Sequence, residues 1–273
     1  MDQKISAPIE ILHRTSYYVI DLDGVVYEGS RLIPGSAEAI NFFRSKDKNV
    51  VFLTNNSIQH PRAIAEKLTR LGIECSVKDV LNSALAAALF IAEKHLDIPS
   101  GIFVIGSEAL REILNESGIR VSSSPDTCSA LLAGMDLSVN YRVIAAGLRA
   151  LNREVPFLIC NRDASYPGED GILMPGCGAI VGALEGASLR RPDYEIGKPS
   201  VIILNLLLRR LSARLEDCLV FGDTLETDIR MAHNAGIESF WISPRGQARI
   251  SRIEKPIFSA QFSSLLEVAA LMR

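Results

Sequence analysis

The sequence predicts an α/β protein built on a doubly wound parallel sheet (a Rossmann-like core), with a second α/β domain inserted into it. Short uncharged runs with strong strand preference alternate with helical patterns along most of the 273 residues. Parallel sheets carry such runs because crossover helices bury their strands on both faces. The run 17–20 leads directly into acidic residues, at the strand end where such sheets bind their ligands.

The first part of the core is predicted from helix caps and apolar stripes. Ser36 is expected to cap a helix that reaches about Lys46. A buried strand over 49–53 and a helix over 61–71 follow, with Pro61 at the first helical position and Gly72 as the C-terminal stop. Asn82 is expected to cap a further helix over 83–95. This βαβα order predicts the parallel sheet.

A linker around 97–101 opens a second, self-contained alternation of strands and helices. Its expected strands are 102–105, 130–133 and 156–160, and its expected helices are 108–117 and 142–151. The core resumes with a long apolar helix over 201–211, strands over 217–221 and 239–242, and a final helix over 263–271. We therefore predict a first core part at 1–98, an inserted domain at 99–193 and a second core part at 194–273.

Composition restricts the class of partner. A net charge of -3 with scattered Lys and Arg does not suit nucleic-acid binding, so we expect a small-molecule partner. The five cysteines show no metal-ligand spacing and are interpreted as free thiols in a reducing compartment. The N-terminus shows no signal-peptide pattern, and no apolar run approaches the ~18 residues that a membrane span needs. A cytoplasmic protein without a membrane partner is expected.

Asp21, Asp23 and Gly24 follow the first strand directly. Two acids that alternate along an extended backbone can reach one site, and their repulsion calls for a cation, a proton or both. Magnesium is the natural candidate. The simpler alternative is an Asx-turn that closes the strand, with Gly24 supplying a permissive backbone angle.

Other strand ends and helix starts carry groups that suit an anion or a metal. Thr54 ends the second core strand, and a generic turn is its alternative interpretation. Lys198 precedes a helix N-terminus, where a cation is unfavourable unless an anion shares the site, and a solvated loop lysine is its alternative interpretation. Asp223 and Asp228 begin another helix, and complementing its dipole is the alternative for such acids.

Together these residues resemble the four motifs of the haloacid dehalogenase (HAD) superfamily of phosphotransferases. The strings are Asp-Leu-Asp-Gly-Val at 21–25, Leu-Thr-Asn-Asn-Ser at 53–57, Gly-Lys-Pro-Ser at 197–200 and Gly-Asp-Thr at 222–224 with Asp228. The resemblance covers nearly the whole chain. It is greatest to the NagD-like subfamily with a type C2 cap, which includes p-nitrophenyl-phosphate, phosphoglycolate and pyridoxal-phosphate phosphatases.

The resemblance implies a phosphatase that works through an aspartyl-phosphate and Mg²⁺. Asp21 would be the nucleophile and Asp23 the general acid and base. Thr54 and Lys198 would bind the transferring phosphoryl group. The implied metal residues are Asp21, Asp23 (through its backbone carbonyl), Asp223 and Asp228.

Substrate contacts are predicted from both parts of the chain. They are Gly24, Asn55, Asn56, Asn161, Asp163 and Lys198. The loop from Asn161 follows a strand end in the inserted domain and suits a substrate-reading role, with an ordinary connecting loop as its alternative. The resemblance also implies a possible homodimer through the cap. A receiver-like phosphoaccepting protein, or a phosphate-ligand sensor with little turnover, is the alternative function.

Overall fold

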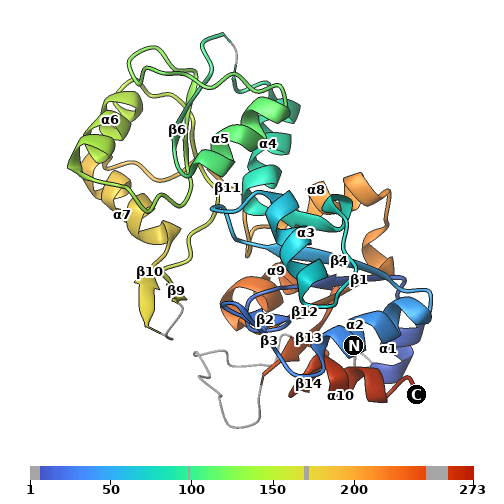
Figure 1. The fold of residues 1–273 in the computed structure, drawn as a ribbon. Coiled ribbons are helices and arrows are strands. Elements are labelled where there is room, and N and C mark those ends of the chain that lie inside the picture. Colours follow the sequence, from blue (N-terminus) through green and yellow to red (C-terminus); the bar gives the residue numbers. More distant parts are fainter. Residues whose placement is uncertain (1–6, 98, 169–171, 244–257) are drawn as a thin grey trace. The chain divides into compact units, whose positions relative to one another are not determined.

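A computed structural model describes residues 7–97, 99–168, 172–243 and 258–273. The prediction about the N-terminus concerns residues outside these ranges. The chain divides into two compact units. Unit 1 comprises residues 1–54, 65–80 and 198–273, and unit 2 comprises residues 55–64 and 81–197. Each unit is described separately below (Figure 1).

Unit 1 is built on the six-stranded sheet β14-β13-β12-β1-β4-β5. Its central strand β1 pairs in parallel with β12 and with β4, and Tyr17 lies opposite both Cys218 and Asn49. β13 and β14 continue the parallel pairing on the β12 side. The strands are β1 (Tyr17–Ile20), β4 (Asn49–Thr54), β5 (Val80–Asn82), β12 (Cys218–Gly222), β13 (Glu238–Ile242) and β14 (Ala260–Phe262).

Helices cover both faces of this sheet, as Figure 1 shows for α2 and α10 on one face and for α8 and α9 on the other. Phe43 of α2 packs edge-on against Tyr18 of β1 at 5.0 Å between ring centroids and stacks on Phe221 of β12. The doubly wound fold is therefore confirmed. The helices are α1 (Pro8–Arg14), α2 (Ser36–Ser45), α3 (Pro61–Arg70), α8 (Val201–Leu211), α9 (Arg230–Ala235) and α10 (Leu265–Ala270), and a short hairpin joins β2 (Tyr27–Glu28) to β3 (Arg31–Leu32).

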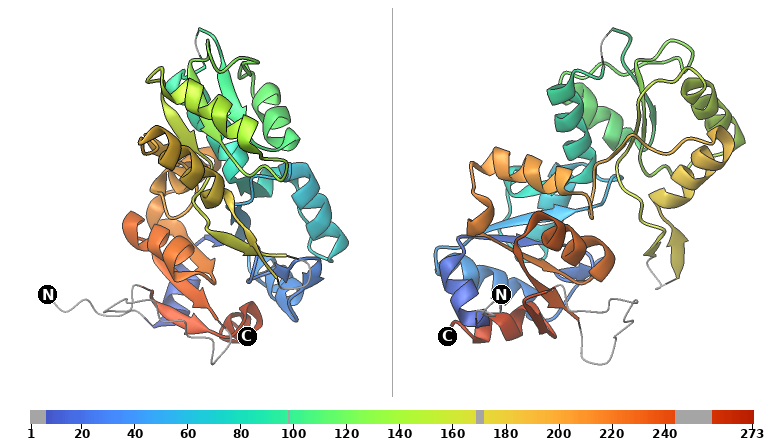
Figure 2. Two further views of the ribbon diagram at one scale, coloured as in Figure 1. Left: turned by 90° about the vertical axis from the view of Figure 1, so that its left-hand side faces the viewer. Right: turned by 180° about the vertical axis from the view of Figure 1, so that it is seen from behind.

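Unit 2 has its own four-stranded sheet, in the order β11-β8-β7-β6, with every pairing parallel. Its strands are β6 (Ile102–Ile105), β7 (Ala130–Ala133), β8 (Phe157–Ile159) and β11 (Tyr194–Glu195), and its helices are α4 (Ser83–Lys94), α5 (Glu108–Glu116), α6 (Tyr141–Leu151) and α7 (Cys177–Ser188). A hairpin of β9 (Ser165–Pro167) and β10 (Leu173–Pro175) stands out from this sheet (Figure 2).

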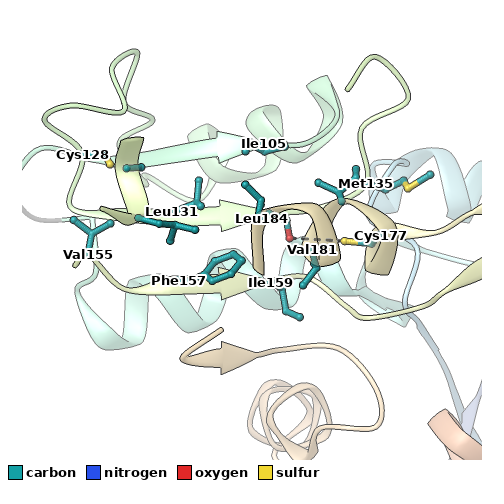
Figure 3. Packing of buried hydrophobic residues seen from close by; sticks show 14 residues of the cluster. Ile105, Cys128, Leu131, Met135, Val155, Phe157, Ile159, Cys177, Val181 and Leu184 are labelled. Carbon is teal, nitrogen blue, oxygen red and sulfur yellow. Dashed lines mark hydrogen bonds between the residues drawn. The ribbon is translucent and has the colours of Figure 1, made fainter. Parts of the chain in front are cut away.

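One apolar cluster holds α6 and α7 against one face of the unit 2 sheet. Leu131 and Phe157 of the strands are fully buried beside Val181 and Leu184 of α7 (Figure 3). Cys177 lies in the same cluster, where its thiol points to the Ala133 carbonyl. All five cysteines of the chain are free, and four of them are buried.

Several predicted helix boundaries agree with the structure, and one cap does not. The Asn82 side chain accepts a hydrogen bond from the Leu85 amide and so caps α4 as expected. The N-cap of α2 is Gly35 rather than Ser36, because the Ser36 hydroxyl donates back to the Ile33 carbonyl from inside the first turn. The hairpins β2–β3 and β9–β10 were not predicted.

The domain boundaries at 98/99 and 193/194 stay a prediction. The two compact units divide the chain at other positions, since α4 belongs to unit 2 and β11 extends the unit 2 sheet by pairing with β8. In the described part of the chain, no helix has the length and apolar character to cross a bilayer.

Candidate active site

Asp21 lies at the carboxyl end of β1, where its amide donates to the Phe221 carbonyl at 2.9 Å. This bond continues the β1–β12 ladder by one residue and fixes the direction of the side chain. The carboxylate is buried and accepts a hydrogen bond from Lys198 Nζ at 2.6 Å. The same Nζ donates to Asp228 Oδ1 at 2.6 Å and to the Leu53 carbonyl at 3.3 Å. Lys198 therefore joins β1, β4 and the turn after β12.

Asp223 and Asp228 complete a group of three acids around this lysine. One oxygen each from Asp21, Asp223 and Asp228 lie within 4.8 Å of one another. Burial raises the pKa of Asp21 well above its ordinary value, the charge of Asp228 adds to that shift, and Lys198 opposes it. Burial and then Asp228 likewise raise the pKa of Asp223 to about 7.

Lys198 responds in the opposite sense. Burial disfavours its charge, but the two aspartates outweigh burial and raise its pKa. One buried cation thus faces three clustered acids and pairs with two of them, Asp21 and Asp228. A further positive charge would stabilise the ionised acids. Carboxylate oxygens are the ligands that hard divalent cations prefer, so these residues fit Mg²⁺.

A π-helical turn over Leu225–Ile229 brings Asp228 back over the end of β12. Gly222 has to be a glycine there, because a Cβ atom would overlap the Asp228 side chain. Asp228 Oδ2 accepts from the Thr224 amide at 3.4 Å and from the Thr227 hydroxyl at 3.2 Å. With Lys198 on Oδ1, both oxygens of Asp228 are hydrogen-bonded.

Two hydrogen bonds that the sequence did not predict hold Asp223 in place. Trp241 of β13 donates its indole N–H to the Asp223 carbonyl at 2.7 Å, and the Thr224 hydroxyl donates to Asp223 Oδ1 at 3.0 Å. The sequence did offer a signal for this contact, since the chain's one tryptophan lies one residue before the end of the strand next to β12.

Gly24 and Asp23 lie in the tight turn after Asp21. Gly24 has φ +82°, and a Cβ atom at this position would overlap the Asp223 carboxylate, so both its backbone angle and its space require glycine. The Asp23 side chain is exposed and does not belong to the buried group of acids. Desolvation still raises its pKa, and the charges of Lys67 and Lys198 oppose this shift.

Thr54 is buried at the carboxyl end of β4, the strand that neighbours β1. Unit 1 therefore brings Asp21, Thr54 and Asp223 to one edge of its sheet through the parallel pairing of their strands. Lys198 and Asp228 reach the same place from the segments before α8 and after β12.

The remaining predicted residues lie in unit 2 and form a hydrogen-bonded group of their own. Asn55 Nδ2 donates to Asp163 Oδ1 at 3.0 Å, and Asn161 Nδ2 donates to the Asn55 carbonyl at 2.7 Å. The Asp163 amide donates to Asn161 Oδ1 at 3.1 Å. Asn56 instead accepts from the Ile58 and Gln59 amides and closes a turn.

Comparison with known proteins gives concordant matches. The family model for haloacid dehalogenase-like hydrolases matches residues 18–120, and a second, described as HAD-hydrolase-like, matches residues 195–263. Phosphoglycolate phosphatase 2 of Arabidopsis thaliana is 31% identical over 247 residues, covering 82% of this chain and 81% of the relative. The acid sugar phosphatase of Staphylococcus haemolyticus is 31% identical over 225 residues, covering 82% of this chain and 84% of its own.

A solved structure agrees with these sequence matches. The p-nitrophenyl phosphatase from Archaeoglobus fulgidus superimposes with a TM-score of 0.87 at 29% identity, covering 94% of this chain and 98% of that chain.

Proposed function

The chain belongs to the haloacid dehalogenase-like hydrolases as a NagD-like phosphatase, and from this premise we propose that Asp21 accepts the phosphoryl group of its substrate and passes it to water. The protein is a phosphoric monoester hydrolase for small phosphate substrates. The observation that carries the proposal is the buried pair of Asp21 and Lys198 at 2.6 Å, at the carboxyl end of the central strand.

In the first step, a carboxylate oxygen of Asp21 attacks phosphorus and the bond to the leaving oxygen breaks. Asp21 has to be ionised for this attack. Its own surroundings raise the pKa, so the charge of Lys198 and of a bound cation would be needed to keep it ionised. Lys198 and Thr54 would also stabilise the negative charge on the transferring group, which is where most phosphoryl-transfer catalysis lies.

Asp23 would supply the proton that the leaving oxygen needs. In the second step the resulting Asp23 carboxylate takes a proton from water, the water oxygen attacks phosphorus, and the bond to Asp21 breaks with release of phosphate. The exposed position of Asp23 in the turn after Asp21 supports this role, because a group that exchanges protons with substrate and water has to be accessible.

Magnesium would be held by the carboxylates of Asp21 and Asp223 and the backbone carbonyl of Asp23. Bound there, it would supply positive charge for the nucleophile and the phosphoryl oxygens. Asp228 would act through a water, a role supported by the engagement of both its oxygens with Lys198, Thr224 and Thr227.

Activity should be lost in excess EDTA, restored by Mg²⁺ and inhibited by Ca²⁺, whose larger shell would let Asp21 bind through both oxygens.

The substrate is proposed only as a small phosphate monoester. The named relatives act on different compounds, so a phosphate-release screen over roughly 100 metabolites is the direct test. Contacts of Gly24, Asn55, Asn56, Asn161 and Asp163 with the substrate stay predictions, as does a homodimer through the cap, which light scattering would detect. The cytoplasmic location also stays a proposal, which the five free thiols support.

The decisive experiment detects the covalent intermediate. Asp23→Asn keeps the backbone carbonyl but removes the proton donor and base, so acetyl phosphate, with its weakly basic leaving group, should still phosphorylate the protein. Rapid-quench mass spectrometry should then find the extra phosphoryl group on Asp21. Label on another residue would contradict the proposal.

A further inference from the structure

The turn that carries Asp23 is held by backbone bonds to Tyr27. The Gly24 amide donates to the Tyr27 carbonyl at 2.9 Å, and the Val26 and Tyr27 amides donate to the Leu22 carbonyl at 2.9 and 3.1 Å. Asp23 and Tyr27 also form an isolated β-bridge. These bonds therefore couple the position of Tyr27 to the positions of Gly24 and Asp23.

Lys67 of α3 contacts this turn and the following hairpin at two points. Its Nζ lies 3.3 Å from the centroid of the Tyr27 ring, a close cation–π contact. The same Nζ donates a hydrogen bond to the Gly29 carbonyl at 2.7 Å, at the tip of the β2–β3 hairpin. Tyr27 is fully buried and Lys67 is half-buried, whereas the hydrogen bond to Gly29 is exposed.

The charge of Lys67 is partly removed from water at this place. Burial lowers the pKa of its amine, Asp23 opposes that shift, and Arg70 adds to it. An ordinary lysine on a helix surface would keep its ammonium group solvated. The loss of solvation here is offset by the ring, the carbonyl and the nearby Asp23, all within unit 1.

We propose that Lys67 is a positioning residue of the active site, which holds the β2–β3 hairpin in place and, through Tyr27 and Gly24, keeps Asp23 where it can transfer its proton. Lys67 acts through these neighbours and is not a catalytic residue. This inference rests on the proposed role of Asp23. It predicts that Lys67 matters most for substrates whose leaving group needs protonation.

The test uses the full-length protein with Mg²⁺ and three substitutions of Lys67. Lys67→Met removes both contacts, Lys67→Gln keeps a donor for the Gly29 carbonyl without the charge, and Lys67→Arg keeps both the charge and the donors. Lys46→Met is the matched control, since Lys46 also lies over an aromatic ring, Phe42 at 5.4 Å, but on an exposed part of the chain.

We expect Lys67→Met to lower the single-turnover rate of phosphoryl transfer from an alkyl phosphate to Asp21 roughly 10-fold, with a smaller loss for p-nitrophenyl phosphate. Lys67→Gln should fall between Met and the wild type, and Lys67→Arg should restore most of the activity. Hydrogen exchange provides a readout besides activity. Peptides covering residues 24–33 should exchange faster in Lys67→Met, whose thermal unfolding midpoint should stay near that of the wild type. The control Lys46→Met should match the wild type in both measurements.

Unchanged exchange over residues 24–33 would overturn the proposal, as would equal losses of the single-turnover transfer rate for alkyl and aryl phosphates. If Lys67→Met does not fold, the comparison of Lys67→Gln with Lys67→Arg decides by the same two readouts. The proposed function fails separately, when Asp23→Asn shows no dependence on the leaving group in the transfer step or when Asp21 carries no phosphoryl label.

Discussion

The two units place polar side chains at the carboxyl ends of parallel strands, but in different electrostatic states. In unit 1, two of three clustered acids pair with one buried lysine, and the pKa values of Asp21 and Asp223 are raised. In unit 2, Asn55, Asn161 and Asp163 hydrogen-bond to one another. Acids whose pKa values are shifted by burial and by neighbouring charges are typical of reacting sites. Polar side chains that are hydrogen-bonded to one another suit recognition or structure. The two regions should therefore respond differently to substitution.

The largest difference is expected from the nucleophile. Asp21→Asn should lower turnover roughly 10⁴-fold or more with every phosphate ester, because an amide cannot form the aspartyl-phosphate. The matched control is Asp217→Asn, since Asp217 directly precedes the other end of β12 and pairs with Arg214. Steady-state assays should show normal activity for this control. A residual rate in Asp21→Asn within ten-fold of the wild type would place the chemistry elsewhere.

The next effect concerns the stability that Lys198 contributes. Lys198→Met would leave Asp21 and Asp228 buried without their cation, and breaking a buried pair in this way typically costs about 3–5 kcal/mol. Urea unfolding in EDTA should show this loss, and Mg²⁺ should recover part of it. Lys46→Met should leave the unfolding free energy within about 0.5 kcal/mol of the wild type. Equal unfolding free energies for Lys198→Met and Lys46→Met would mean that Lys198 does not stabilise the buried acids of unit 1.

A smaller effect is expected from pH in the metal-free protein. The pKa of Asp223 is raised from 3.8 to about 7, so the folded state holds a proton that the unfolded chain releases between these values. This contribution to stability is present below about pH 4 and is lost as the pH rises through about 7. Thermal unfolding in EDTA at several pH values should show the decline, and both Mg²⁺ and Asp223→Asn should weaken it. An identical pH trend in Asp223→Asn would exclude Asp223 as its source.

The smallest change is expected in unit 2. Asp163→Ala removes one hydrogen bond from the Asn55 side chain and should alter the order of preferred substrates, while p-nitrophenyl phosphate hydrolysis falls by less than about 10-fold. The measurement is kcat/KM over a panel of phosphate esters. A loss by the same factor for all of them would assign Asp163 a structural role or a general catalytic role.

The sequence alone determined the local elements and the classes of the reacting groups. The uncharged run 17–20 formed β1, the Asn82 cap began α4, and α3 ended just before Gly72, because strand preference and capping depend on residues close together in the chain. The four motif strings also carried the phosphatase assignment, which the named relatives confirm.

Only the tertiary structure decided how these groups meet. The convergence of Asp21, Asp223 and Asp228 depends on the parallel register of β1 with β12, and the fixing of Asp223 depends on Trp241 in the next strand. The contact of Lys67 with Tyr27 depends on where α3 lies. Such contacts join residues far apart in the chain, and the raised pKa values follow from burial, which depends on how the whole chain packs.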